Sequence, residues 1–141
     1  MSFIDSVKNT LKATVDAVTG HSAIVELETE GKPGPGAVIE VKMIVTSTGL
    51  ELHSKAAYVD VHGEDDLDES ALERMREFLM DRDPAFTFEV HGPFHVAPEG
   101  KTYLSGRFIM PSGIDMKRIW LARGRIQHAG QDPHSQYRLI E

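Results

Sequence analysis

Seven histidines in a chain of 141 residues are the first feature that could carry chemistry. Near the C-terminus, His128 and His134 flank Asp132 in a predicted turn, and these three side chains could approach one metal ion together. Such a group would make the chain a metal-binding module or a metal-dependent hydrolase. Solvated histidines in strands and loops are the more common explanation of a high count. We therefore predict no metal and no cofactor, and keep the metal site as an alternative.

Arginines offer a second kind of chemistry, the binding of an acidic partner, and four of them are candidates: Arg107, Arg118, Arg123 and Arg125. Arg123 and Arg125 share one face of a predicted strand and could form a basic stripe. A stripe of this kind suits an acidic peptide or a phosphorylated group. Cross-strand ion pairs with Glu26, Glu28 or Glu40 are the alternative use of the same arginines.

The usual signatures of an enzyme are missing from the sequence. Ser105 and Ser112 stand beside glycine, but neither lies in a Gly-x-Ser-x-Gly nucleophile motif. The glycines of residues 31–36 are not followed by a helix whose N-terminus could hold a phosphate. Adjacent carboxylates such as Asp65 and Asp66 lie in a polar loop where nothing would raise a pKa toward neutrality. We predict that the chain is not an enzyme.

Composition indicates one soluble domain that binds protein rather than nucleic acid. A length of 141 residues fits a single core, and a net charge of −7 disfavours the binding of phosphate backbones. No apolar run approaches the ~20 residues of a membrane-spanning helix. Asp5 and Lys8 interrupt the start of the chain, which lacks the apolar core of a secretory signal. We expect a cytoplasmic protein.

Residues 1–20 have the pattern of an amphipathic helix, because Phe3, Val7, Leu11 and Val15 recur every four residues. The favoured interpretation is a helix that packs on its own domain. Contact with a membrane surface or with a partner is the alternative, and the small number of lysines on the polar face weakens the membrane version.

A second short helix is predicted near residues 70–80. Leu72, Met75 and Leu79 fall on one helical face after an acidic run that begins at Glu64. The run lacks the alternating carboxylates, the central glycine and the distal glutamate of a calcium-binding EF-hand. A solvated loop that leads into a helix is the simpler interpretation.

The rest of the chain alternates apolar and polar residues, which predicts strands with one wet face. The strands are expected at 23–28, 39–46, 50–62, 86–91, 103–110, 117–127 and around Tyr137 and Leu139. Trp120 shares a face with small and apolar residues, which favours a place in the core over a ligand-stacking role. Short strands about ten residues apart are typical of an all-β antiparallel sandwich, here one domain over residues 21–141.

Several segments resemble, in the same order, those of arrestin-fold proteins, and above all the bacterial sporulation-control group. They are the opening Met-Ser-Phe at 1–3, the Pro-Gly-x-Val turn at 35–38, the Tyr-x-Ser-Gly-x-Phe-Ile-Met-Pro element at 103–111, the Trp-containing run at 118–124 and the Asp-Pro-x-Ser turn at 132–135. The resemblance implies an immunoglobulin-like β-sandwich lobe that acts as a non-catalytic adaptor or regulator.

The chain departs from this family in two respects. Arrestin-like proteins usually join two lobes, whereas 141 residues supply one, and the segment 64–83 looks like loop and helix where strands would be expected. A lone lobe exposes the surface that a second lobe would cover, so a homodimer is one expected form. We predict a cytoplasmic regulator or scaffold that binds another protein through a sheet edge or through the arginine-lined face.

Overall fold

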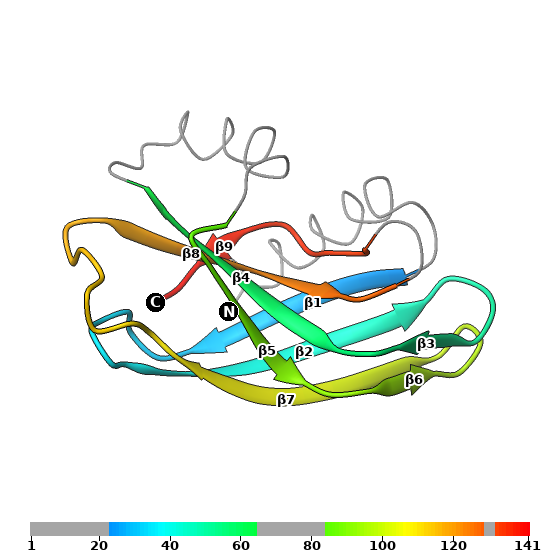
Figure 1. Ribbon diagram of the computed structural model, residues 1–141. Helices are drawn as coiled ribbons and strands as arrows, with labels where there is room; N and C mark the ends of the chain where they lie inside the picture. The colour runs from blue at the N-terminus through cyan, green and yellow to red at the C-terminus, as the bar shows by residue number, and fades with distance from the viewer. Residues whose placement is uncertain (1–22, 65–83, 129–131) are drawn as a thin grey trace.

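The computed structural model describes residues 23–64, 84–128 and 132–141. Within these ranges every regular element is a β-strand (Figure 1). The strands are β1 (Ala23–Glu30), β2 (Val38–Ser47), β3 (Leu52–Ser54), β4 (Ala57–Glu64), β5 (Phe86–His91), β6 (Phe94–Val96), β7 (Lys101–Ile109), β8 (Ile119–Ile126) and β9 (Arg138–Leu139).

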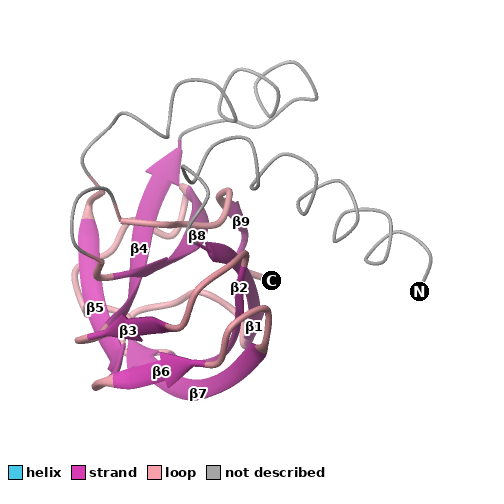
Figure 2. Cartoon of the chain, turned by 90° about the vertical axis from the view of Figure 1, so that its right-hand side faces the viewer, coloured by secondary structure: helices cyan, strands magenta, loops and turns pink. Residues whose placement is uncertain are grey.

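All strand pairs are antiparallel, and they form three sheets. One sheet has the order β1-β2-β7, the second has the order β5-β4-β8-β9, and β3 pairs with β6 in a short ribbon. Figures 1 and 2 show the two larger sheets as layers facing each other, with the β3–β6 ribbon at one end. The prediction of an all-β antiparallel fold is confirmed for the described residues.

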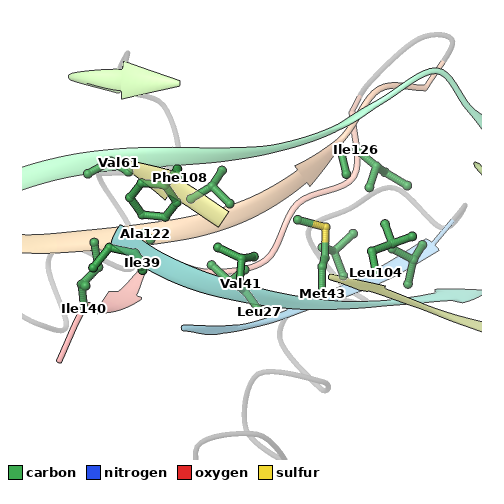
Figure 3. Packing of buried hydrophobic residues seen from close by; sticks show 14 of the residues in the cluster. Leu27, Ile39, Val41, Met43, Val61, Leu104, Phe108, Ala122, Ile126 and Ile140 are labelled. Atoms are coloured by element: carbon green, nitrogen blue, oxygen red, sulfur yellow. The ribbon is translucent and has the colours of Figure 1, made fainter. Parts of the chain in front are cut away.

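The alternation in the sequence sets which side chains enter the space between the layers. Ala23, Val25 and Leu27 of β1 are buried, and the side chains between them are more exposed. The same alternation places in the core the inward-facing residues Ile39, Val41, Met43, Val45, Ala57, Val59, Val61, Leu104, Phe108, Trp120, Ala122 and Ile126. In Figure 3 the side chains of Val41 and Leu104 point from β2 and β7 toward the opposite sheet. These inward faces are the predicted ones.

Aromatic contacts close the core between β5, β7 and β8. The rings of Phe88 and Phe108 stack with centroids 4.9 Å apart, and the ring of Phe86 lies 5.9 Å from that of Trp120. Trp120 is 5% exposed, which confirms its predicted place in the core. A Cβ at Gly63 would lie 2.8 Å from this indole, so glycine is needed there for the close approach.

The structure adds short elements that periodicity does not reveal. Residues 94–96 lie between two of the predicted strands but form β6, in which His95 lies opposite His53 of β3. Three residues are too few to show a period, and Pro93 and Pro98 on either side suggest a loop. The last strand is only Arg138–Leu139.

Both predicted helices, at 1–20 and near 70–80, lie outside the described residues. In the described part of the chain, no helix has the length and apolar character needed to cross a membrane.

Candidate functional site

A buried carboxylate organises the outer face of the β5-β4-β8-β9 sheet. Asp60 lies in the middle of β4, opposite Arg123 of β8, and is fully buried although it points away from the core. Arg123 Nε donates to Asp60 Oδ2 at 2.8 Å. Arg125 donates to the same carboxylate through Nε (3.0 Å to Oδ2) and Nη2 (3.3 Å to Oδ1). Arg125 therefore binds Asp60 through two hydrogen bonds, and this bidentate geometry is the most specific way in which a guanidinium binds a carboxylate.

Two further groups complete this cluster. The hydroxyl of Thr87 on β5 donates to Asp60 Oδ1 at 2.9 Å, and Arg125 Nη1 donates to Asp132 Oδ2 at 2.8 Å. Asp132 also accepts a hydrogen bond from the backbone N–H of His128 at 3.0 Å. We call Asp60, Arg123, Arg125 and Asp132 the Asp60 cluster. Its two acids balance its two bases, it joins β4, β8 and the C-terminal segment, and the hydrogen bond from Thr87 links it to β5.

The surroundings shift the pKa values of the cluster so that its charges are retained. Burial alone would raise the pKa of Asp60, but hydrogen bonds from Arg125 and Arg123 and their positive charges outweigh it and hold the pKa below its ordinary value. Burial would likewise lower the pKa of Arg125, but contacts with Asp60 and Asp132 raise it above its ordinary value. Both groups are ionised at neutral pH.

Tyrosines cover the two guanidinium groups. The guanidinium carbon of Arg123 lies 5.1 Å from the ring centroid of Tyr137, and that of Arg125 lies 4.7 Å from the ring of Tyr58. The Tyr137 hydroxyl is buried and has no hydrogen-bond partner among the described residues. Burial raises the pKa of this hydroxyl to about 12.

The position of Arg123 and Arg125 bears directly on the predicted basic stripe. They share one face of β8, as predicted, and both guanidinium groups donate hydrogen bonds to Asp60 of the neighbouring strand β4. A ligand that used them would first have to replace a buried carboxylate. The Asp60 cluster is therefore suited to holding strands together.

The other two candidate arginines lie elsewhere. Arg118 is exposed just before β8, whereas Arg107 is exposed on β7, where it stands opposite Glu40 of β2. This register places an arginine opposite Glu40, one of the glutamates of the predicted ion pairs, but Arg107 and Glu40 form no ion pair among the described residues. The structure thus separates the four candidates into a buried pair and two exposed positions on different elements.

Arg107 belongs to a mixed polar and apolar surface on the outer side of the β1-β2-β7 sheet. We call it the β2–β7 face and define it by the outward residues Val38, Glu40, Lys42 and Ile44 of β2 and Tyr103, Ser105, Arg107 and Ile109 of β7. Val38 is 48% exposed, Tyr103 72% and Ile109 60%. Large apolar side chains at this exposure, next to charged ones, are typical of contact surfaces.

The charges on this face have no partners within the described part of the chain. Glu40, Lys42 and Arg107 make no ion pair there, in contrast to the arginines of the Asp60 cluster. They are available to a second molecule.

The predicted metal ligands His128, Asp132 and His134 are close in the chain but are used differently. Asp132 is bound by Arg125 and by the N–H of His128, and Nδ1 of His134 lies 2.9 Å from the carbonyl of Ser135. Burial lowers the pKa of His134, although its contact with Ser135 raises it. No group of three or more histidine, aspartate or glutamate side chains in residues 23–64, 84–128 and 132–141 is arranged to hold a metal ion.

Two contacts lie near the sheet edges, the other predicted binding surface. On one side Gly106 of β7 lies so close to β5 that an added Cβ would be 2.3 Å from the carbonyl oxygen of Val90. On the other side the Arg138 guanidinium donates through Nη1 to the carbonyl of Leu27 on β1. These contacts join the two larger sheets at β7 and β5 and at β1 and β9.

Comparison with known proteins gives one structural relationship. The sequence matches no family model and no curated protein. Among solved structures, the chain is similar to Spo0M, the sporulation control protein from Bacillus subtilis, with a TM-score of 0.54 and 14% sequence identity. The chain has a Spo0M-like fold. The match covers 82% of this chain and 48% of the other, so the chain spans about half the length of the Spo0M structure.

This likeness confirms the resemblance to arrestin-like, sporulation-control proteins that the ordered segments indicated. At 14% identity it establishes the fold alone and transfers no residue role.

Sequence reasoning did not find Asp60, the centre of the polar cluster, or Tyr103 and Ile109 on the exposed face. A signal for Asp60 was present, because aspartate is disfavoured inside strands and Asp60 stands in the middle of an apolar alternation. Two arginines separated by one residue on another strand were the natural partners. The alternation along β7 places Tyr103 and Ile109 on the side opposite Leu104 and Phe108, but it gives no sign that these apolar side chains are left uncovered.

Proposed function

We propose that this chain is a non-catalytic protein-interaction module, a regulator or scaffold of the arrestin-like type, and that its contact surface is the β2–β7 face. The observation that carries the proposal is the contrast between the two sets of arginines. Arg123 and Arg125 are held by Asp60, whereas Arg107 is exposed beside exposed apolar side chains. A partner can use Arg107 without breaking the fold.

The Spo0M-like fold supports a regulatory role, since the solved protein is described as a sporulation control protein. The same likeness supports an immunoglobulin-like lobe as the finer description of the two packed sheets. A cytoplasmic location is part of this proposal. The partner contributes groups that accept hydrogen bonds from Arg107 and apolar side chains opposite Tyr103 and Ile109.

Affinity capture from the native cell tests the contact surface. The tagged chain is compared with Arg107→Glu, which reverses an exposed charge without touching the Asp60 cluster. Lys55→Glu is the matched control, because Lys55 is exposed in the β3–β4 connection and undergoes the same change in charge. We expect a protein captured by the wild type and by the control to be lost with Arg107→Glu.

Reversal of Arg123 or Arg125 would be a poor test, since it would leave Asp60 buried beside a like charge and compromise folding. If the captured proteins are the same for Arg107→Glu and the wild type, the β2–β7 face is not the contact surface and the proposal fails.

A further inference from the structure

The outward side chains of β2 form a pattern that is complementary to itself. Along the strand they are Val38, Glu40, Lys42 and Ile44, that is, apolar, negative, positive and apolar. Reversing the direction of this row exchanges the two charges and leaves the apolar residues at the ends. A second copy of the row, turned end to end, therefore presents Lys42 to Glu40, and Ile44 to Val38.

The neighbouring strand matches the apolar ends of this row in register. Val38 pairs with Ile109, and Ile44 pairs with Tyr103, so apolar residues occupy both ends of the face on both strands. The centre of β7 holds Arg107 and Ser105, which have no like-charged partner when the row is reversed. The whole β2–β7 face is thus compatible with its own inverted copy.

We infer that this face binds a second copy of the chain in a two-fold symmetric dimer. The axis lies in the plane of the face, across the strands, and passes between Glu40 and Lys42. Glu40 of each protomer then lies over Lys42 of the other, and the end that carries Ile109 lies over the end that carries Tyr103. This is an isologous contact, in which one patch serves both subunits. It resembles the aligned packing of two sheets, ~10 Å apart with strands crossing at ~30°.

The inference rests on the proposed function, because it takes the same face and names the partner. Charge complementarity selects a second copy: Glu40 and Lys42 make no ion pair within the described residues, and each would gain one in the dimer. Burial of Val38, Tyr103 and Ile109 would supply the apolar part.

The same geometry limits the strength of the dimer. From Val38 to Ile44 the face is ~20 Å long, and its two strands are ~5 Å apart. The area of such a face is smaller than that of a standard stable interface. On the third strand the rotation brings Glu28 of one copy near Glu30 of the other, so β1 must lie at the solvated rim, where such repulsion is screened. We therefore expect a weak dimer that forms from micromolar to near-millimolar concentration.

Complementary charge reversal tests this arrangement by sedimentation velocity across that range. Glu40→Lys places like charges at both central contacts of its own dimer, and Lys42→Glu does the same with negative charges. Each variant alone should associate about tenfold more weakly than the wild type, because two exposed ion pairs become two repulsions. An equimolar mixture of the two variants should associate again, and so should the double variant Glu40→Lys/Lys42→Glu.

Restored association would show that the single variants are folded. Glu89→Lys, which changes an exposed residue of β5, is the matched control and should associate like the wild type. A wild type that stays monomeric up to near-millimolar concentration would overturn the inference, as would a mixture that fails to associate. A monomeric chain whose captured partner is still lost with Arg107→Glu would refute the dimer and leave the proposed function standing. If the wild type dimerises and the proteins captured with Arg107→Glu are the same as those captured with the wild type, the dimer stands and the proposed function fails.

Discussion

Removal of the Asp60 carboxylate should cost the protein a large part of its stability. In Asp60→Ala the guanidinium groups of Arg123 and Arg125 stay where they are but lose the anion that compensates them. The side chain of Arg123 is 10% exposed and that of Arg125 is 23% exposed, so water can replace little of the lost contact. Breaking a buried ion pair by removing one partner costs about 3–5 kcal/mol.

We expect a value near the lower end, about 3 kcal/mol, because Arg125 keeps its contact with Asp132. Thr87→Ala removes one hydrogen bond to the same carboxylate and should cost about 1 kcal/mol. If Asp60→Ala does not fold, Thr87→Ala still measures the contribution of a contact to the Asp60 carboxylate. Glu89→Ala, an exposed change on the same sheet, is the control and should stay within about 0.5 kcal/mol of the wild type.

Urea unfolding measures these differences, and Trp120 is a suitable reporter because it is the only tryptophan and lies in the core. For a slope of about 2 kcal/mol/M, Asp60→Ala should lower the midpoint by about 1–2 M. A loss below about 1 kcal/mol would show that the cluster behaves like a surface ion pair, and the reasoning from burial would be refuted.

The dependence on pH separates charge from shape, with Asp60→Asn as the uncharged variant of similar size. The pKa of Asp60 is lower in the folded protein than its ordinary value of 3.8, so the unfolded chain binds the proton more readily. The stabilisation by the carboxylate is complete above that value and is lost as the pH falls through the folded pKa. The stability difference between wild type and Asp60→Asn should therefore be constant near neutrality and shrink below about pH 4. A difference that stays constant into acid would contradict the assigned charge.

Three further predictions concern single residues, each measured by urea unfolding. Gly106→Ala should destabilise the protein by about 1–3 kcal/mol, because the new Cβ would lie 2.3 Å from the carbonyl oxygen of Val90. Gly113→Ala is the control and should be nearly neutral, since a Cβ there would meet open space. Equal effects of the two substitutions would contradict this prediction. Burial lowers the pKa of His134, so the stability advantage of wild type over His134→Asn should shrink as the pH falls below about 6.5, and an unchanged advantage would argue against the buried neutral imidazole. Tyr137→Phe should be neutral or stabilise by up to about 1 kcal/mol, since the buried hydroxyl finds no acceptor among the described residues; a clear loss would reveal a partner for it.

The strands of this fold were largely predictable, because a strand that is buried on one side alternates apolar and polar residues with a period of two. Val25, Met43 and Val59 all fall on the predicted inner face. The pairing partners were not predictable, since β2 lies beside both β1 and β7, and β7 begins more than fifty residues after β2 ends. Local periodicity contains no information about which strand lies next to which.

The candidate site was predictable only in part for the same reason. Arg123 and Arg125 were recognised as a pair on one strand face, but whether they bind a ligand or an acid of the protein depends on what the neighbouring strand presents. The strand that supplies Asp60 lies some sixty residues earlier in the chain. Residue type and spacing identify a group that can bind an acid, and only the register of β4 on β8 shows that the acid is internal.

The two outer faces of the sandwich show why exposure of a charge matters more than its presence. On β8, the C-terminal segment places Asp132 and Tyr137 over Arg125 and Arg123. Because a buried charge is costly unless it is paired, the charges of these arginines must be balanced within the fold. On β2 and β7 nothing in the described residues pairs with Glu40 or Arg107, so these charges carry little cost and contribute little to folding. Mutations should therefore separate cleanly: those in the Asp60 cluster change stability, and those on the β2–β7 face change association. A variant at Arg107 that lost a partner with an unchanged unfolding midpoint would locate recognition on the face that folding leaves free.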